Sequence, residues 1–188
     1  MGPSPPCSPA STPGATPPRT TGPSATPAWR HAKRMNPLDR RHLDGNSPNM
    51  EGQFDTKVAV VLLEDLPVWQ KANAAAFLVS GIAGSTPRLV GEAYVDGSGN
   101  RYLPMLRQPI LIYAADSTGV RRAYERAMAR EVEQLSIFTC ELFSTPHDTA
   151  NRAAVAAVPA AELDLVGIAL RADRKIVDKV LDKLRPHP

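Results

Sequence analysis

The sequence predicts an α/β layer fold, in which strands and helices alternate along the chain. Short apolar runs of strand length, rich in Val, Ile and Leu, recur between longer segments. Polar and apolar residues do not alternate within these runs. A continuous apolar run is typical of a strand that is buried on both faces of a sheet. The segments between them carry apolar residues three or four positions apart, which indicates helices that cover the sheet.

The first strand and helix are the clearest elements. Residues 57–63 (KVAVVLL) form a continuous apolar run and predict a buried strand. Asp65 can cap the following helix, and Pro67 stands near its first turn, where proline is tolerated. The helix is rich in Ala and is expected to end at Gly81 or Gly84, since glycine commonly terminates helices.

A hairpin, a second buried strand and a second helix are predicted next. Residues 89–95 and 102–106 flank the Gly-containing loop 96–100, which favours a β-hairpin. Residues 108–115 (QPILIYAA) read as a buried strand. Ser117 then caps a helix whose apolar face lies opposite its charged residues.

The last third repeats this alternation twice. Residues 135–142 (LSIFTCEL) are strand-like, and Thr145 is expected to cap a short Ala-rich helix. Residues 163–170 (LDLVGIAL) predict a final strand. Asp173 then opens a last helix with one apolar face.

Proline separates a tail from the domain. Of the 19 prolines, 11 lie in the first 50 residues. We predict a disordered Pro/Ser/Thr-rich tail over residues 1–55 and a single domain over 56–186, because the tail holds too little apolar surface to offset the entropy of ordering it. The tail could instead reflect an over-extended start, with Met35 or Met50 as the true first residue. The sequence does not decide between these starts.

The charge balance argues against a nucleic-acid partner without excluding it. Residues 1–50 hold six basic and two acidic side chains, whereas residues 51–188 hold 16 basic and 17 acidic ones. The domain is therefore nearly neutral, and a surface that binds phosphates needs clustered Lys and Arg. One predicted helix does carry four arginines on its charged face: Arg121, Arg122, Arg126 and Arg130.

The same sequence predicts a cytoplasmic protein with no membrane partner. No apolar run approaches the roughly 18 to 20 residues of a membrane-spanning helix. The N-terminus lacks the apolar block of a secretory signal, because prolines recur every few residues there.

The familiar catalytic and cofactor signatures are absent. The chain has no GxGxxG, no Walker loop, no GxSxG and no CxxC motif. Beyond the predicted tail, the chain contains two histidines, His147 and the penultimate His187, so a multi-histidine zinc site cannot be assembled there. We therefore expect neither a cofactor nor a bound metal.

Polar residues after two strand ends are the candidate ligand site. The cluster TPHDTANR follows one predicted strand, and a second polar group follows the first strand. Ligands of open α/β sheets favour the crevice at the carboxyl ends of strands, and mixed polar groups beside one Trp suit a small polar ligand. The alternatives are helix caps for Asp65 and Thr145, a core role for Trp69 and a solvated surface for Lys71. The predicted ligand-binding residues are Asp65, Trp69, Asn73, Thr145, His147 and Asp148.

The order of these segments resembles the family catalogued as domain of unknown function 2000. The likeness rests on KVAVVLLEDLPVWQKANAAAFLVSGIAG, then GEAYVDGSGNRYLPM, QPILIYAAD and FTCELFSTPHDTANR, and it covers about residues 56–186. That family resembles type II peptidyl-tRNA hydrolases in fold. The resemblance implies a three-layer αβα architecture, with a mixed sheet of about four main strands plus a small hairpin.

The chain matches the hydrolase pattern only in part. Asp65 and Leu66 match its turn, whereas Lys71 matches a catalytic lysine only with a shift of one position. Val79 stands where the helix histidine is expected, and Glu141 stands near the place of a later acid. Under a hydrolase mechanism, the resemblance implies Asp65, Lys71, Glu141 and His147 as the catalytic residues.

Three functions remain open. The first is a small ligand-binding or regulatory module without the full catalytic set of the hydrolases. The alternative is a hydrolase or esterase that acts on an aminoacyl-ester substrate. The third is a homodimeric scaffold, since Ala-rich helix faces can serve subunit packing. The sequence leaves open whether the protein is an enzyme.

Overall fold

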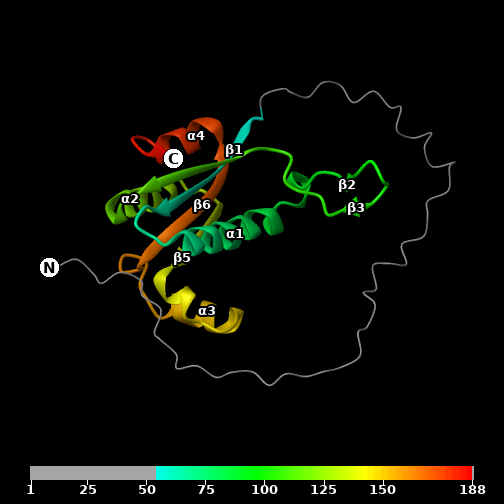
Figure 1. The fold of residues 1–188 in the computed structure, drawn as a ribbon. Coiled ribbons are helices and arrows are strands. Elements are labelled where there is room, and N and C mark those ends of the chain that lie inside the picture. The colour runs from blue at the N-terminus through cyan, green and yellow to red at the C-terminus, as the bar shows by residue number, and fades with distance from the viewer. Residues whose placement is uncertain (1–53, 188) are drawn as a thin grey trace, which may run out of the picture. The chain divides into compact units, whose positions relative to one another are not determined.

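The computed structural model describes residues 54–187, so residues 1–53 of the predicted tail, with the alternative start residues, lie outside the described part. The last two residues of that predicted tail, Phe54 and Asp55, are hydrogen-bonded to Arg174. The described residues form a mixed five-stranded sheet, a separate two-stranded hairpin and four α-helices, which confirms the predicted α/β class (Figure 1). The strands are β1 (Thr56–Leu63), β2 (Tyr94–Val95), β3 (Arg101–Tyr102), β4 (Ile110–Ala115), β5 (Gln134–Thr139), β6 (Leu165–Asp173) and β7 (Arg185–Pro186). The helices are α1 (Val68–Ser85), α2 (Ser117–Met128), α3 (Asp148–Ala156) and α4 (Arg174–Val180), with short 3-10 turns η3 (Pro87–Leu89) and η4 (Cys140–Phe143).

The sheet has the strand order β5-β6-β1-β4-β7. Strand β1 pairs parallel with β4 and antiparallel with β6, while β6 also pairs antiparallel with β5. Strands β1, β4 and β5 therefore run in the same direction, and their carboxyl ends share one edge of the sheet.

The side chains of the central strand β1 alternate between two hydrophobic cores. Val58, Val60 and Leu62 pack in the core beneath α1, whereas Ala59 and Val61 pack in the core formed with α2 and α4. Successive side chains of a strand point to opposite faces, so a wholly apolar strand needs helices on both sides. Figure 1 shows α1 on one face of the sheet and α2 with α4 on the other.

Helix α1 continues past both glycines that were expected to end it. A side chain at Gly81 would bring its Cβ within 2.6 Å of the Ser136 hydroxyl on β5, so this glycine allows the helix to lie close to the sheet. The helix ends shortly before Pro87, whose ring disfavours a helical residue before it. Its N-cap is Pro67 and no side chain caps it, so the predicted capping role of Asp65 is wrong.

Two other helix starts differ from prediction by one or two residues. Asp116 caps α2 in place of Ser117, and its carboxylate accepts a hydrogen bond from the Gly119 N–H at 2.7 Å. His147 caps α3 in place of Thr145. In each case a neighbouring side chain with a suitable acceptor occupies the cap position.

Strand β5 is shorter than predicted. The pairing of β5 with β6 shifts register between Phe138 and Thr139, and the chain then turns into η4. Cys140 directly follows the last residue of β5, and its backbone N–H donates to the Asp164 carbonyl at 2.9 Å. The apolar run therefore continues past the strand into a turn that packs against the core beneath α1.

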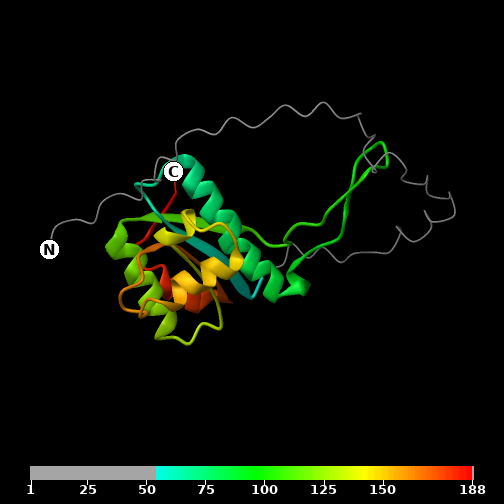
Figure 2. The ribbon, with the colours of Figure 1, turned by 90° about the horizontal axis from the view of Figure 1, so that it is seen from below.

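The hairpin is the end of a long projection that we call the arm, residues 90–107. Figures 1 and 2 both show it extending away from the sheet. Its root is closed by hydrogen bonds from the Gly91 N–H to the Met105 carbonyl and from the Arg107 N–H to the Leu89 carbonyl, both 2.9 Å. The predicted hairpin is thus present, although its two strands have only two residues each.

Asp96 organises the tip of the arm. Its carboxylate accepts hydrogen bonds from the Ser98 and Asn100 backbone N–H groups, from the Asn100 side chain and from the Tyr102 hydroxyl, at 2.8 to 2.9 Å. The bonds from Asn100, followed by the one from Tyr102, lower the pKa of Asp96 to about 2. The same contact raises the pKa of Tyr102 above its ordinary value.

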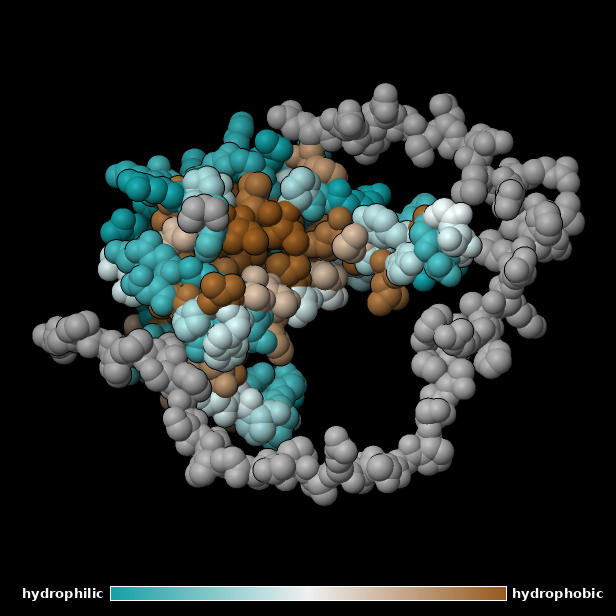
Figure 3. Space-filling model, in the orientation of Figure 1, coloured by the Kyte–Doolittle hydropathy of each residue, from teal (hydrophilic) through white to brown (hydrophobic). Residues whose placement is uncertain are grey.

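The described surface carries an apolar area between β4 and α1, which is brown in Figure 3. Ile112 on β4 is 41% exposed, and Val68 at the start of α1 is also exposed. Among the described helices, none has the length and hydropathy that crossing a bilayer requires.

Candidate functional site

The carboxyl ends of β1, β4 and β5 form the edge of the sheet where polar residues gather. Asp65 follows β1, Asp116 follows β4 and Glu141 follows β5. Open α/β sheets place their ligands at such an edge. We call it the carboxyl edge.

An aromatic contact joins two segments at this edge. The Trp69 ring, in the first turn of α1, lies edge-on to the Phe143 ring of η4, with 5.7 Å between the ring centroids. Phe143 in turn lies 4.9 Å from Phe138, which contacts Phe77. The contact brings η4, which precedes the predicted polar cluster 145–152, beside the first turn of α1. Trp69 is 55% exposed, so its expected alternative as a core residue is wrong.

Three polar residues near this contact are exposed. Asp65 lies in the turn before α1, Asn73 lies one helical turn after Trp69, and Glu141 lies two residues before Phe143. Residues four apart share a face of a helix, so Asn73 and Trp69 lie on the same side of α1.

The polar residues after η4 form bonds within their own segment. The Thr145 hydroxyl donates to the Leu142 carbonyl at 3.1 Å and also bonds to Asn151. His147 Nδ1 accepts a hydrogen bond from the Ala150 N–H at 3.2 Å, which caps α3. This cluster thus stabilises the start of a helix.

Asp148 also serves α3. Its carboxylate pairs with Arg152 at 2.6 Å, one helical turn later, and both side chains are exposed. A negative charge in the first turn of a helix is favourable beside the positive end of the helix dipole. Asp148 is therefore already partnered at the surface.

Lys71 lies on a different flank of α1 from Trp69. Its ammonium nitrogen is 3.4 Å from His187 Nε2. The backbone N–H of His187 donates to the Ile112 carbonyl of β4 at 2.9 Å. Lys71 and Trp69 are two residues apart, which places them on roughly opposite sides of the helix. The structure therefore associates Lys71 with the β4 side of α1 and Trp69 with the β5 side.

Of the four arginines predicted on one helix face, Arg130 lies beyond the end of α2 and two of the three on α2 are engaged in the fold. Arg121 donates to the carbonyls of Ala160 and Leu163, and its guanidinium lies 5.7 Å from the centroid of the Tyr124 ring. Arg126 donates to the Asp182 carbonyl at 2.8 Å. Only part of this basic face is thus a solvated surface, which weakens the case for a phosphate-binding helix.

Metal ligands do not gather in the described part: residues 54–187 contain no group of three or more His, Cys, Asp or Glu side chains suited to hold an ion.

The comparisons with known proteins assign a family. Residues 56–188 match the family model described as "Protein of unknown function (DUF2000)". The chain belongs to this family. A solved structure of a protein of unknown function from Agrobacterium tumefaciens strain C58 is 45% identical, with a TM-score of 0.70; the match covers 72% of this chain and all of that one. No curated protein matches.

Membership of DUF2000 confirms the family predicted from the sequence, over nearly the same residues. Neither the family description nor the solved relative names an activity.

Sequence reasoning missed a second group of polar residues at the opposite end of the sheet. Arg88, Arg107 and Arg171 come together there around a small cavity. One sequence signal was available: Arg171 interrupts the apolar run of β6, where a charged residue needs a partner.

Proposed function

We propose that this chain is a binding module for a small polar molecule, with its site at the carboxyl edge. The contact between Trp69 and Phe143 carries the proposal, because it unites the segments that follow β1 and β5. An indole that is 55% exposed leaves ring surface for a ligand to cover.

Exposed hydrogen-bonding groups flank this ring. Asp65 and Glu141 offer carboxylate oxygens, and Asn73 offers both a donor and an acceptor. A few polar groups beside an aromatic surface are the usual composition of a small-molecule site. We assign ligand binding primarily to Trp69, Asp65, Asn73 and Glu141.

Thr145, His147 and Asp148 have a secondary role in this proposal. Each already has a partner in its own segment, so a ligand would meet only their remaining atoms, such as His147 Nε2. Their contribution is to fix the segment between η4, which contacts Trp69, and the start of α3.

The alternative is a hydrolase of an aminoacyl ester, with the type II peptidyl-tRNA hydrolase fold as its basis. Asp65 or Glu141 would orient a water molecule, Lys71 would stabilise the developing oxyanion, and Thr145 or His147 would assist the leaving group. This mechanism has less support, because Lys71 lies beside His187 and His147 Nδ1 is engaged in the cap of α3.

A thermal-shift screen of the full chain tests the binding function. A ligand that binds only the native state raises Tm, by an amount that grows with its concentration over Kd. We expect a small polar metabolite to raise Tm in the native protein and to lose this effect in Trp69→Ala. Phe77→Ala is the matched control, because Phe77 is an equally exposed aromatic residue (54%) on the same helix.

Two results would contradict the proposal: no shift with any metabolite of the panel, or an equal loss in the two variants. Turnover of an N-blocked aminoacyl ester that disappears in Lys71→Ala would establish the hydrolase instead.

A further inference from the structure

A cavity lies at the edge of the sheet opposite to the carboxyl edge, where β1 begins, β6 ends and the arm leaves the domain. Its volume is about 200 Å³. We call it the arginine cavity. The residues that line it are Phe54, Asp55, Thr56, Arg88, Leu89, Arg107, Gln108 and Arg171.

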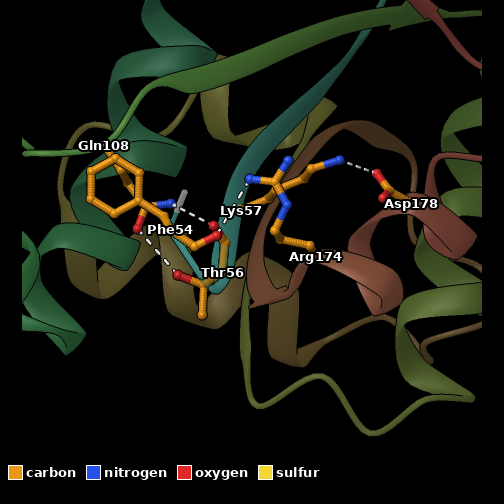
Figure 4. Close-up of polar contacts among 6 residues, drawn as sticks. All are labelled: Phe54, Thr56, Lys57, Gln108, Arg174 and Asp178. Carbon is orange, nitrogen blue, oxygen red and sulfur yellow. Dashed lines mark hydrogen bonds and ion pairs between the residues drawn. The ribbon is translucent and has the colours of Figure 1, made fainter. Parts of the chain in front are cut away.

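One wall of the arginine cavity is fixed by a pair of reciprocal hydrogen bonds (Figure 4). The Thr56 hydroxyl donates to Gln108 Oε1 at 3.2 Å, and Gln108 Nε2 donates to the Thr56 carbonyl at 3.3 Å. Gln108 is only 5% exposed. These bonds tie the start of β1 to the segment that leads into β4.

Helix α4 holds the same wall from the other side. Arg174 donates through its guanidinium to the Phe54 carbonyl at 3.3 Å and through its backbone N–H to the Asp55 carbonyl at 3.1 Å. Lys57 forms an ion pair with Asp178 of α4, as Figure 4 also shows. The wall is therefore built by the fold itself, which is the preorganisation that a binding site needs.

Arg171 lines the cavity from β6 and is held by neighbouring side chains. Its Nη1 donates to Gln134 Oε1 at 3.1 Å, and Gln134 Nε2 donates to the Thr86 hydroxyl at 2.6 Å. Its Nε is buried and makes no hydrogen bond within the described part of the chain. The hydrogen bond to Gln134 fixes the guanidinium in place before any ligand arrives, as a preorganised site requires.

The charges at the cavity have one predominant sign. Three arginines line it and one acid, Asp55, stands among them, which leaves a net charge of +2. Arg88 lies in η3 just before the arm, and Arg107 is the last residue of the arm. Both are exposed, while Arg171 comes from the sheet. Like charges held around one space repel each other, and an anion between them relieves that repulsion.

We propose that the arginine cavity binds a small doubly charged oxyanion, such as the phosphate of a monoester or a dicarboxylate. Guanidinium groups match the oxygens of both groups with paired hydrogen bonds. A cavity of about 200 Å³ is smaller than the roughly 300 to 1,000 Å³ typical of drug-sized pockets, so it suits an anion with a short organic body. The site is independent of the one proposed at the carboxyl edge.

Calorimetric titration of the full chain tests this site, with inorganic phosphate and succinate as probes and chloride as the ionic-strength control. We expect one of the two probes to bind saturably. Arg107→Gln and Arg88→Gln should each weaken its binding about tenfold, which corresponds to the loss of one charge-assisted contact. Arg122→Gln is the matched control, because Arg122 is an exposed arginine on α2 outside the cavity.

Arg88 and Arg107 carry the test because they are exposed, so their substitution spares the buried network of Arg171. Phosphate or succinate binding identifies which oxyanion the site prefers, and either result supports it. No binding above the chloride control, or equal binding by the Arg88, Arg107 and Arg122 variants, would overturn the proposal. Trp69→Ala should leave the titration unchanged, which separates this site from the carboxyl edge.

Discussion

The two ends of the sheet satisfy their polar residues in opposite ways. At the carboxyl edge, His147 bonds three residues away, Asp148 four and Thr145 six. At the arginine cavity, the bond from Thr56 to Gln108 spans 52 positions, and the bonds made by Gln134 span 48 and 37. The polar cluster after η4 is held by neighbours in sequence, whereas the arginine cavity is held by residues brought together only by folding.

This difference shows why a dense polar cluster in a sequence is weak evidence for a binding site. Short polar side chains near a helix start have backbone donors within reach. They therefore bond to the helix terminus, which leaves fewer of their atoms for a ligand. Residues that converge from distant segments have no such local partners. At that end the fold leaves the buried Arg171 Nε without a hydrogen bond among the described residues.

Loss of the long-range network should have the largest effect on stability. Gln134→Leu removes the acceptor of Arg171 and the donor to Thr86 while keeping a similar volume. We expect the free energy of unfolding to fall by about 2 kcal/mol, because a partly buried charged group loses its hydrogen bond. Urea denaturation of the full chain measures this.

Thr86→Val is the milder comparison variant, because it removes only the hydrogen bond between two neutral groups. It should lower the free energy of unfolding by about 1 kcal/mol. A change in the free energy of unfolding of less than about 0.5 kcal/mol in Gln134→Leu is what a surface substitution produces. That result would show that the network does not stabilise the fold.

Loss of a local bond at the carboxyl edge should cost less. His147→Ala removes the N-cap of α3, which is worth about 1 kcal/mol. The change should be confined to α3, as faster hydrogen exchange of its first-turn amides. Asp148→Asn should cost less than about 0.5 kcal/mol, because its ion pair is exposed. If His147→Ala also speeded hydrogen exchange of amides throughout the sheet, the start of α3 would not be a locally stabilised segment.

The tip of the arm is the most local cluster, and it should respond to pH without affecting the rest of the domain. The folded pKa of Asp96, about 2, lies below its ordinary 3.8, so its bonds stabilise the tip fully above about pH 4. This contribution is lost as the pH falls through 2. An NMR titration of the carboxyl group should give that low pKa, and Tyr102→Phe should raise it; a value near 3.8 would mean that the tip is open in solution.

Hydrophobic pattern was sufficient to predict most of the sheet and helices. The apolar run of β1 and the helical periodicity of α2 each reflect burial against a core, which leaves a regular trace in sequence. Strand β7 was not predicted, because Arg185 and Pro186 are atypical strand residues that pair with the edge of β4. Helix starts shifted by one or two residues, since several adjacent polar residues could serve as the cap.

Only those site residues whose position follows from a single segment could be predicted from the sequence. Trp69 and Asp65 follow β1 directly, so their position at the carboxyl edge follows from the strand. The contact of Trp69 with Phe143 depends on the register shift after Phe138 and on η4. The apolar run continues past Phe138 in the sequence and gives no sign of either feature. The arginine cavity draws on four separate segments, and no spacing rule connects them.

The position of β6 has a consequence for how the domain forms during synthesis. This strand lies between β1 and β5, yet it follows both of them in the chain. Until Leu165–Asp173 leaves the ribosome, the nascent chain holds two fragments of a sheet with an unfilled gap and exposed strand edges. Pairing of distant strands is slow, so the domain should fold late and in one step, and truncated chains that lack β6 should aggregate.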